Sequence, residues 1–206
     1  MGKKHQEGFT LIELLVLMMV LAVTLGLGVP AFNAMMANNR MSAAANDLVS
    51  SLHSARAEAL TRSRSVTMCA SLGWQADQPV CDGGTASLLD GWIVFVDEDS
   101  DGTVDNGELV LQTHGPLHDS IRSQPNSKSD SDPPYYLSFS AVGVLQNIAG
   151  LPPAVTNIQL CDARGDEDTG GGTAAGRWIN LSPAGRPALI DDVSMLQGAD
   201  NPLQGC

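Results

Sequence analysis

Carboxylates between residues 97 and 108 have the types and the spacing of a calcium-binding loop. The acids at the first, third, fifth, ninth and twelfth positions of this stretch are Asp97, Asp99, Asp101, Asp105 and Glu108. Gly102 stands sixth, where an EF-hand loop needs a glycine for its sharp turn. Calcium prefers oxygen ligands at such alternating positions. The stretch therefore predicts calcium as the candidate cation.

The sequence around this stretch favours a second interpretation. EF-hand loops join two helices, whereas here GWIVFV precedes the acids and ELVLQT follows them, and both runs have the composition of strands. A solvated hairpin loop with an Asp-Gly turn fits that context. Neighbouring carboxylates repel one another unless a cation neutralises them. Both interpretations therefore stay open, and no other cofactor is expected.

A further carboxylate, Glu13, stands alone in an apolar run. Between Phe9 and Phe32 it is the only charged residue among 24. At 1.5 Å per residue such a helix measures roughly 36 Å, which is enough to cross a bilayer. A charge near the bilayer centre costs roughly 2.5–3.5 kcal/mol on insertion scales. Glu13 therefore either needs a partner or reaches back to the headgroups from the first helical turn.

The flanks of this run predict a membrane anchor that is retained. A secretory signal is cleaved after its apolar run, whereas here the small residue Gly8 lies before it, at the end of the leader MGKKHQEG. Lys3 and Lys4 favour a cytoplasmic N-terminus by the positive-inside tendency. The chain after Pro30 is then expected on the other side of the membrane. Pro30 itself should kink the helix, because proline removes one backbone hydrogen bond.

The charge of the chain is unevenly distributed. Residues 40–64 carry four arginines against two acids, a balance of +2, whereas from residue 65 onward 19 acids oppose 5 bases, a balance of −14. An acidic domain is a poor general binder of nucleic acid, because such affinity rests on Lys and Arg neutralising phosphates. DNA is therefore a disfavoured partner that would need a local basic patch.

The cysteines are even in number and lie in the part of the chain expected outside the cytoplasm, where disulfides form. They are Cys69, Cys81, Cys161 and Cys206. Among the three connectivities that four cysteines allow, we predict the pairs 69–81 and 161–206. A zinc site or free thiols are the alternatives, but the sequence has no Cys-x-x-Cys pair that would favour zinc.

Beyond the anchor the sequence predicts a helix and then strands. Residues 33–64 keep a helical composition, with Leu48, Leu52, Ala55 and Ala59 at spacings that put them on one face. Seven runs bounded by turn residues are predicted to be antiparallel strands, at 65–70, 91–96, 108–113, 135–140, 157–162, 177–182 and 186–191. Residues 165–176 are predicted to be a flexible surface loop. No arrangement of histidines or cysteines supports catalysis, so no enzyme activity is expected.

The start of the chain resembles a known class of proteins. A short basic leader, then GFTLIE (residues 8–13) and an apolar helix with Pro30, is similar to the class III signal of type IV pilins and type II secretion pseudopilins. The resemblance implies that a prepilin peptidase cuts after Gly8 and that the new amine of Phe9 is N-methylated. It also implies that Glu13 pairs with the terminal amine of a neighbouring subunit and so favours assembly.

Later segments resemble the GspH/FimT branch of the same superfamily. They are GWIVFVDEDSDGTVDNGELVLQ (91–112), CDARG (161–165) and RWINLSPAGR (177–186). The branch implies a long N-terminal helix packed against two β-sheets. Gly185 and Arg186 match the start of a Gly-Arg-x-Arg motif with which FimT-like pilins of DNA uptake hold DNA. The second arginine of that motif is replaced here by Ala188.

Together these observations predict an α+β protein, with a long N-terminal α-helix packed on an antiparallel, β-sandwich-like globular domain. The predicted divisions are a cleaved leader at 1–8, a transmembrane and assembly helix at 9–32, an amphipathic helix at 33–64 and the β domain at 65–206.

The expected function is that of a minor type IV pilin of the FimU/FimT kind, which primes pilus assembly and lies near the pilus tip. It would start as a single-pass protein of the inner membrane with a periplasmic C-terminal domain. Its expected partners are major and minor pilins, the prepilin peptidase, and the inner membrane with its assembly platform. The alternatives are a GspH-type minor pseudopilin of type II secretion, a DNA-binding pilin for DNA uptake, and a plain single-pass membrane protein that is not cleaved.

Overall fold

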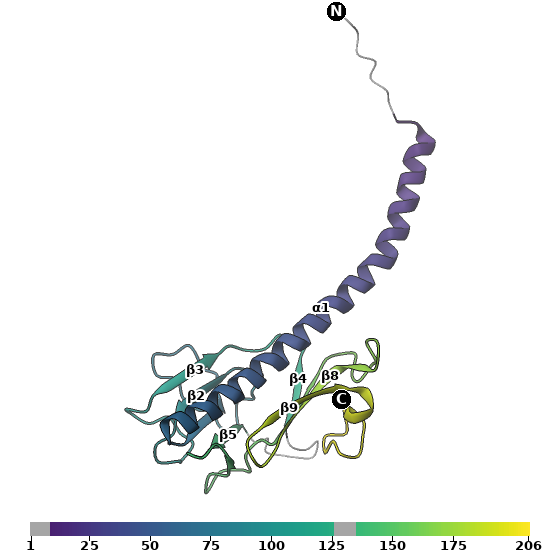
Figure 1. Ribbon diagram of the computed structural model, residues 1–206. Helices are drawn as coiled ribbons and strands as arrows, with labels where there is room; N and C mark the ends of the chain where they lie inside the picture. Colours follow the sequence, from purple (N-terminus) through teal and green to yellow (C-terminus); the bar gives the residue numbers. More distant parts are fainter. Residues whose placement is uncertain (1–8, 126–134) are drawn as a thin grey trace, which may run out of the picture. The chain divides into compact units, whose positions relative to one another are not determined.

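The computed structural model describes residues 9–125 and 135–206 (Figure 1). The leader, with the predicted cleavage position Gly8, lies outside the described residues. The chain divides into two compact units, Met1–Asn39 and Arg40–Cys206. The division falls inside the first helix, which therefore contributes to both units.

Helix α1 extends from Leu11 to Arg62 and begins with a side-chain cap. Thr10 directly precedes the first turn, and its Oγ1 accepts a hydrogen bond from the Glu13 amide at 3.3 Å. That bond satisfies one of the amides that the start of a helix leaves without a partner. A Thr followed three residues later by Glu is a sequence signature of this kind of helix start.

The C-terminal end of α1 has a backbone cap. Ser63 adopts a left-handed φ of 51°, and the Arg64 amide donates to the Ala59 carbonyl at 3.3 Å. These are the features of a Schellman cap, which satisfies carbonyls of the last turn. The predicted helical segments 9–32 and 33–64 thus form one continuous helix, which begins two residues later and ends two residues earlier than predicted.

Pro30 lies inside α1, and the helix continues through it. Its ring leaves the Gly26 carbonyl without the amide donor that a helix normally supplies four residues later. Gly26, Gly28 and Pro30 also belong to the residue types with the lowest helix propensity. This stretch is therefore the intrinsically weakest part of the helix, and the kink at Pro30 stays a prediction.

From Arg40 onward α1 buries one face in the second unit. The buried residues of the helix are Met41, Ala44, Ala45, Leu48, Ser51, Leu52, Ala55 and Ala59. They recur at spacings of three and four, which is the period of one helical face. The face includes all four residues that the sequence predicts to dock on a sheet, and most of its side chains are small, so the helix backbone can approach the strands closely.

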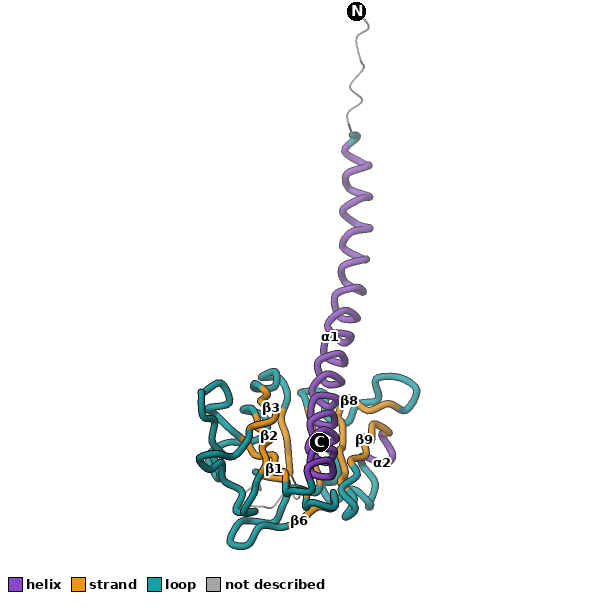
Figure 2. The backbone as a smooth tube through the Cα atoms, turned by 60° about the vertical axis from the view of Figure 1, so that its left-hand side comes forward, coloured by secondary structure: helices purple, strands orange, loops and turns teal. Residues whose placement is uncertain are grey.

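Two antiparallel sheets receive this face. The first has the order β3-β2-β1-β5-β6, with β1 at Val66–Ala70, β2 at Trp92–Val96, β3 at Val110–His114, β5 at Tyr136–Phe139 and β6 at Leu145–Gln146. The second has the order β4-β7-β8-β9, with β4 at Arg122–Pro125, β7 at Asn157–Cys161, β8 at Thr173–Leu181 and β9 at Pro187–Asp192, followed by the short helix α2 at Val193–Leu196. Figure 2 shows one sheet on each side of the C-terminal half of α1.

One hydrophobic core joins α1 to both sheets. Leu48 and Leu52 of the helix share it with Met68 of the first sheet and with Leu160 and Ile179 of the second. A polar contact lies inside it, because the hydroxyl of buried Ser51 accepts hydrogen bonds from Trp92 Nε1 at 3.1 Å and from Gln112 Nε2 at 3.0 Å. The predicted α+β fold with a long helix on antiparallel sheets is confirmed.

The opposite face of the first sheet has a smaller core of its own. Alternation along β1 turns Cys69 away from the helix, into a cluster with Phe95, Tyr136 and Ile148. Val104 of the acidic loop packs against the same cluster. Loops, and not a second layer of regular structure, therefore cover this face, and one of them is the loop that carries the candidate calcium ligands.

All seven predicted strands are present, but the sequence analysis was wrong at four places. Residues 165–176 were expected to be a flexible loop, whereas β8 already begins at Thr173, and Ala174 and Ala175 are buried. This start of β8 was missed because glycine and alanine have a low β propensity. Strand β6 and helix α2 were not predicted because each is too short for its periodicity to stand out, and β4 was not predicted because its residues, RSQP, are all polar or proline.

Candidate functional site

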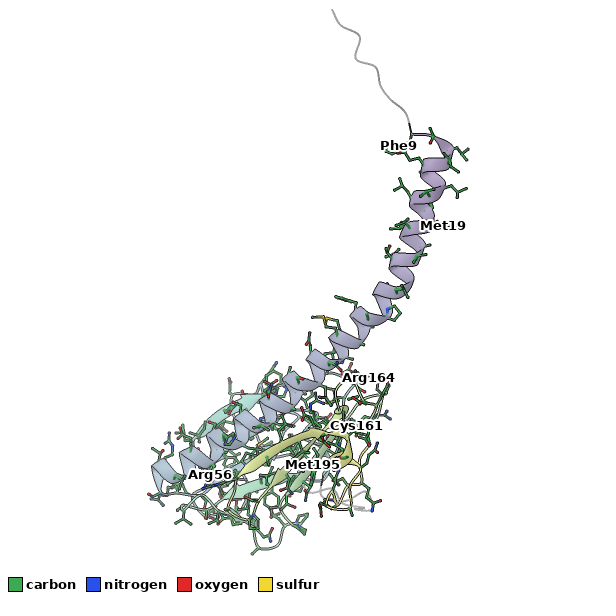
Figure 3. All side chains as sticks on the ribbon, turned by 45° about the vertical axis from the view of Figure 1, so that its right-hand side comes forward. Phe9, Met19, Arg56, Cys161, Arg164 and Met195 are labelled. Carbon is green, nitrogen blue, oxygen red and sulfur yellow. A yellow bond between two sulfur atoms is a disulfide. The ribbon has the colours of Figure 1, made fainter. Side chains whose placement is uncertain are left out.

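The N-terminal part of α1 exposes apolar side chains on all its sides. Every residue from Phe9 to Met36 is exposed within the chain. Figure 3 shows these side chains, among them the labelled Phe9 and Met19, projecting from the helix. Among the described residues, α1 is the one helix that is long and apolar enough to cross a membrane, and its most apolar stretch is not buried within the chain.

Glu13 is the single carboxylate of this surface. It occupies the third position of the helix, where its own amide is held by Thr10 Oγ1 at 3.3 Å. A carboxylate in the first turn interacts favourably with the helix dipole. Because its side chain is exposed and makes no ion pair with any residue of 9–125 or 135–206, Glu13 is available to a partner from another chain.

The acidic loop between β2 and β3 is tied to the fold at its first residue. Asp97 is fully buried, and its Oδ2 accepts hydrogen bonds from Thr67 Oγ1 at 2.6 Å and from the Gly102 amide at 3.2 Å. Its Oδ1 accepts from the Asp101 amide at 3.1 Å. Burial raises the pKa of the Asp97 carboxyl above its ordinary value, the three hydrogen bonds oppose that shift, and the charge of Asp101 adds to it.

The last residue of the loop closes it. Glu108 Oε1 accepts a hydrogen bond from the Glu98 amide at 2.7 Å, and Glu108 Oε2 accepts one from the Asp105 amide at 3.0 Å. In the middle of the loop, Gly102 has a φ of 79°, and a Cβ there would lie 2.8 Å from side-chain carbons of Ile148 and Leu151. Glycine is therefore required both by the turn and by the close packing.

The loop brings the predicted calcium ligands into two groups of three, which share Asp99. One oxygen each from Asp97, Asp99 and Glu108 lie within 4.8 Å of one another, and so do one oxygen each from Asp99, Asp101 and Asp105. These carboxylates are the hard oxygen donors that calcium takes. The flanking elements are strands and not helices, as the second interpretation of the sequence expected. The residues present therefore fit a calcium ion, on a scaffold unlike that of an EF-hand.

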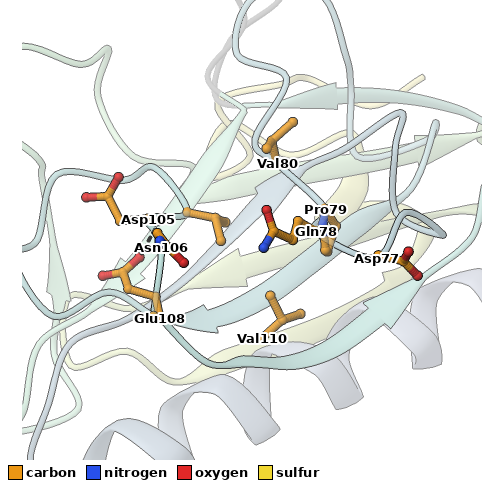
Figure 4. A pocket seen from close by; sticks show the side chains of 10 residues that line it. Asp77, Gln78, Pro79, Val80, Asp105, Asn106, Glu108 and Val110 are labelled. Atoms are coloured by element: carbon orange, nitrogen blue, oxygen red, sulfur yellow. Dashed lines mark hydrogen bonds between the residues drawn. The ribbon is translucent and has the colours of Figure 1, made fainter.

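A cleft of about 330 Å³ lies beside this loop. Asp105, Glu108 and Val110 line one part of it, and Asp77 and Val80, from the loop that ends at Cys81, line another (Figure 4). The lining combines carboxylates with valine side chains and contains no basic residue. Its carboxylates favour cations or cationic side chains over anions.

Both predicted disulfides are present, and both hold loops of the β domain. Cys69 of β1 is bonded to Cys81, and Cys161 of β7 is bonded to Cys206, with a Cα–Cα distance of 5.6 Å in each pair. The second bond fixes the last residue of the chain to the second sheet. The Cys206 amide also donates to Asp166 Oδ2 at 2.8 Å.

The residues considered for DNA binding lie in and after the turn between β8 and β9. Arg186 is exposed, and the turn is closed by a hydrogen bond from the Ser182 amide to the Arg186 carbonyl at 3.0 Å. Gly185 has a φ of 72°, which favours glycine at this position. Ala188 stands on the following strand, so no second arginine comes from the motif itself.

The family models decide the relationship of this chain to known proteins. The model described as "Prokaryotic N-terminal methylation motif" matches residues 3–29. The model described as "Type II transport protein GspH" matches residues 44–195, which is most of the β domain and part of α1. The chain belongs to the GspH family. The predicted membership of the pilin and pseudopilin superfamily, in its GspH/FimT branch, is thereby confirmed.

Two solved structures are similar to this GspH-family protein. Both are crystal structures of the type IV minor pilin FimU of Pseudomonas aeruginosa strain PAO1. The one in space group P21 is 24% identical, with 74% of this chain and 89% of that chain covered and a TM-score of 0.48. The one in space group P65 is 22% identical, with 72% and 91% covered and a TM-score of 0.45. No curated protein sequence matches the chain at a significant level.

Two features of the site were missed from the sequence although a signal existed for one of them. The Thr10 cap follows from the spacing of Thr and Glu in GFTLIE, which is a known helix start. The contact of Ser51 with Trp92 and Gln112 joins residues 41 and 61 positions apart. No local pattern predicts such a contact.

Proposed function

We propose that this GspH-family protein is a minor type IV pilin of the FimU/FimT kind. Its leader is cut after Gly8 and the new N-terminus, Phe9, is methylated. The protein waits in the inner membrane with its β domain in the periplasm, and then enters a helical bundle that it helps to prime near the pilus tip. The observation that supports this most is the exposed apolar surface of α1 from Phe9 to Met36, most of which lies within the methylation motif matched at residues 3–29.

Glu13 has a defined role in this proposal. An unpaired carboxylate is costly at membrane depth, and its desolvation is offset only if a cation with good geometry lies next to it. The methylated amine of a neighbouring subunit supplies that cation once subunits pack side by side. Glu13 therefore favours the bundle over the isolated subunit and sets the register of the helices.

The proposed partners follow from the same surface. Major and minor pilins provide the apolar helices that cover α1, the prepilin peptidase acts on the junction of Gly8 and Phe9, and the assembly platform of the inner membrane moves the subunit. The role is structural and needs no catalytic residue.

Mass spectrometry of the mature N-terminus tests the proposal. A chain that starts at methylated Phe9 supports it, whereas a chain that keeps Met1 overturns it. A Gly8→Leu variant serves as the matched control, because it should block processing in the same cells without touching the helix.

A second candidate is a GspH-type minor pseudopilin of type II secretion. It is favoured by the description of the family whose model matches residues 44–195. The two candidates share the anchor, the processing and the fold, so they differ only in the machine they serve. Deletion of the gene distinguishes them: loss of twitching motility supports the pilus, and loss of protein secretion with normal twitching supports the pseudopilus.

We also propose calcium as the ligand of the 97–108 loop. It is supported by two groups of three carboxylates on a closed loop, which share Asp99, and the ion would neutralise their repulsion. Calorimetric titration of the protein with calcium should release heat, and an Asp99→Asn variant should weaken binding. No heat at millimolar calcium would leave the plain hairpin loop as the correct interpretation. DNA binding through Arg186 is tested separately by gel shift at low salt, where electrostatic binding is strongest.

A further inference from the structure

A small apolar surface with two arginines lies where α1 ends beside the turn between β5 and β6. Its residues are Arg56, Leu60, Val142, Val144 and Arg186, and we name it the arginine–valine patch. The exposed fractions are 45% for Leu60, 71% for Val142 and 37% for Val144. Arg56, labelled in Figure 3, is half-buried, and Arg186 is exposed.

Glycine backbone holds the three segments of this patch together. Arg56 Nε donates to the Gly143 carbonyl at 2.9 Å. A Cβ at Gly143 would lie 3.0 Å from Leu60 Cδ2, and a Cβ at Gly185 would collide with the Gly143 carbonyl oxygen. The helix, the 140–144 turn and the 182–186 turn are therefore packed without space between them, so the patch is formed before any partner arrives.

The patch differs in charge from the rest of the β domain. Neither Arg56 nor Arg186 makes an ion pair with a carboxylate of residues 9–125 or 135–206, although the chain from residue 65 onward has a balance of −14. Arginine and apolar side chains together are typical of the centre of a protein interface. Two arginines are few for the phosphate contacts of a nucleic acid, and exposed valines add nothing to such contacts.

The same chain carries a surface of complementary chemistry. Asp99, Asp101 and Asp105 are exposed on the acidic loop, and Val80, which lines the cleft together with Asp105, is 50% exposed. We name these four residues the acidic loop surface. It offers negative charge beside an apolar side chain, which is what a partner of the arginine–valine patch must offer.

Both surfaces belong to the same end of the first sheet. Val66 at the start of β1 is paired with Val96 at the end of β2 and with Phe139 at the end of β5. The acidic loop leaves β2 at this end, and the 140–144 turn leaves β5 at this end. Two copies related by a two-fold axis can therefore form the contact twice, since in such a pair each surface meets its complement on the other copy.

We propose that the arginine–valine patch binds the acidic loop surface of a second copy of this chain. The contact goes beyond the proposed function and does not depend on it. At low ionic strength the overall negative charge opposes pairing. At about 0.15 M salt the Debye length falls to about 8 Å, so the local contacts outweigh the distant repulsion.

The test uses the full chain in uncharged detergent with a chelator, and sedimentation equilibrium measures the mass. The wild-type chain should form dimers. Arg186→Glu and Asp99→Lys each place like charges opposite one another twice per dimer, so each should raise the Kd at least about tenfold. Val142→Asp should do the same. An equimolar mixture of Arg186→Glu and Asp99→Lys restores both contacts, and should dimerise as the wild-type chain does.

The mixture is the decisive measurement, because only a direct contact between these two surfaces lets one variant restore the other. Both substituted residues are exposed, and thermal unfolding verifies that the variants are folded. Dimers that persist in each single variant would show that another part of the chain, such as α1, pairs the copies, and would overturn the proposal. A mixture that stays monomeric would overturn it as well. So would loss of gel-shifted DNA in Arg186→Glu together with unchanged dimers, since the patch would then serve DNA.

Discussion

Replacing Ser51 by alanine should destabilise the β domain far more than any exposed serine of the same helix. The Ser51 hydroxyl is buried and accepts hydrogen bonds from Trp92 Nε1 and Gln112 Nε2. The indole N–H of Trp92 is buried too, and a buried donor that loses its acceptor costs about 1–3 kcal/mol. Gln112 is half-buried and can turn to water, so its loss is smaller, about 0.5–1 kcal/mol. Alanine returns about 0.5 kcal/mol of helix propensity.

The expected net loss is about 2 kcal/mol, a large share of the roughly 5–15 kcal/mol that stabilises a typical domain. Urea unfolding of the full chain in uncharged detergent, followed by near-UV circular dichroism with the disulfides intact, measures it. Ser50→Ala is the matched control, because Ser50 is the exposed neighbour on the same helix and should change stability by less than about 0.5 kcal/mol.

A double-mutant cycle with Trp92→Phe separates the hydrogen bond from other effects. Once the indole N–H is gone, Ser51→Ala should cost at least about 1 kcal/mol less than it does alone. Equal losses for Ser50→Ala and Ser51→Ala, or additive losses for Ser51→Ala and Trp92→Phe, would refute the reasoning.

Three further predictions concern the anchor, the pH response and the disulfides. Glu13→Ala and Glu13→Gln should both leave cleavage at the leader intact and abolish incorporation into the assembled bundle. Immunoblots of sheared fibres measure the incorporation. Normal incorporation of Glu13→Gln would show that assembly does not need the negative charge of Glu13. The cap hydrogen bond with Ser194 lowers the pKa of Asp192 in the folded chain. The ionised carboxylate therefore stabilises the fold above the ordinary aspartate pKa of about 3.9, and this stabilisation is lost as the pH falls through the lower pKa of the folded state. The urea midpoints of Asp192→Asn and of the wild-type chain should therefore differ at higher pH and converge below about pH 4. A difference between the two midpoints that does not change with pH would contradict this. Removing the disulfide of Cys161 and Cys206, whose sequence separation is 45, should cost about 4 kcal/mol, against about 3 for the other disulfide with a separation of 12; the reverse order in urea unfolding would contradict the loop-length argument.

Much of this fold could be predicted because its signals are local. The 52-residue helix has its cap, its apolar run and its later one-sided face written in consecutive residues. The strands β1 and β2 are apolar runs bounded by turns, and both were predicted within a residue of their limits. The branch resemblance added the two sheets, which no periodicity could have supplied.

The parts that failed depend on contacts between distant residues. Thr173–Gly176 become strand because residues 167–169 bond to them, through the bridge of Asp168 with Ala174, and because the core accepts their small side chains, although glycine and alanine carry no strand propensity. The two residues of β6 are strand only through their pairing with β5. The candidate site shows the same division: the spacing of the acids was visible, whereas the anchoring of Asp97 by Thr67, 30 residues away, was not.

The anchoring of Asp97 is part of a hydrogen-bond network that crosses three strands of the first sheet. Thr67 Oγ1 is within 2.9 Å of Ser138 Oγ, and Gln146 Nε2 donates to Ser138 Oγ at 3.0 Å. Because Thr67 gives its proton to Asp97, Ser138 must give its own to Thr67, so the hydroxyls of β1 and β5 form one directed chain that ends at the carboxylate. This chain of hydrogen bonds ties the first residue of the acidic loop to β1, β5 and β6, and within it Thr67 bonds to residues that lie 30 and 71 positions away.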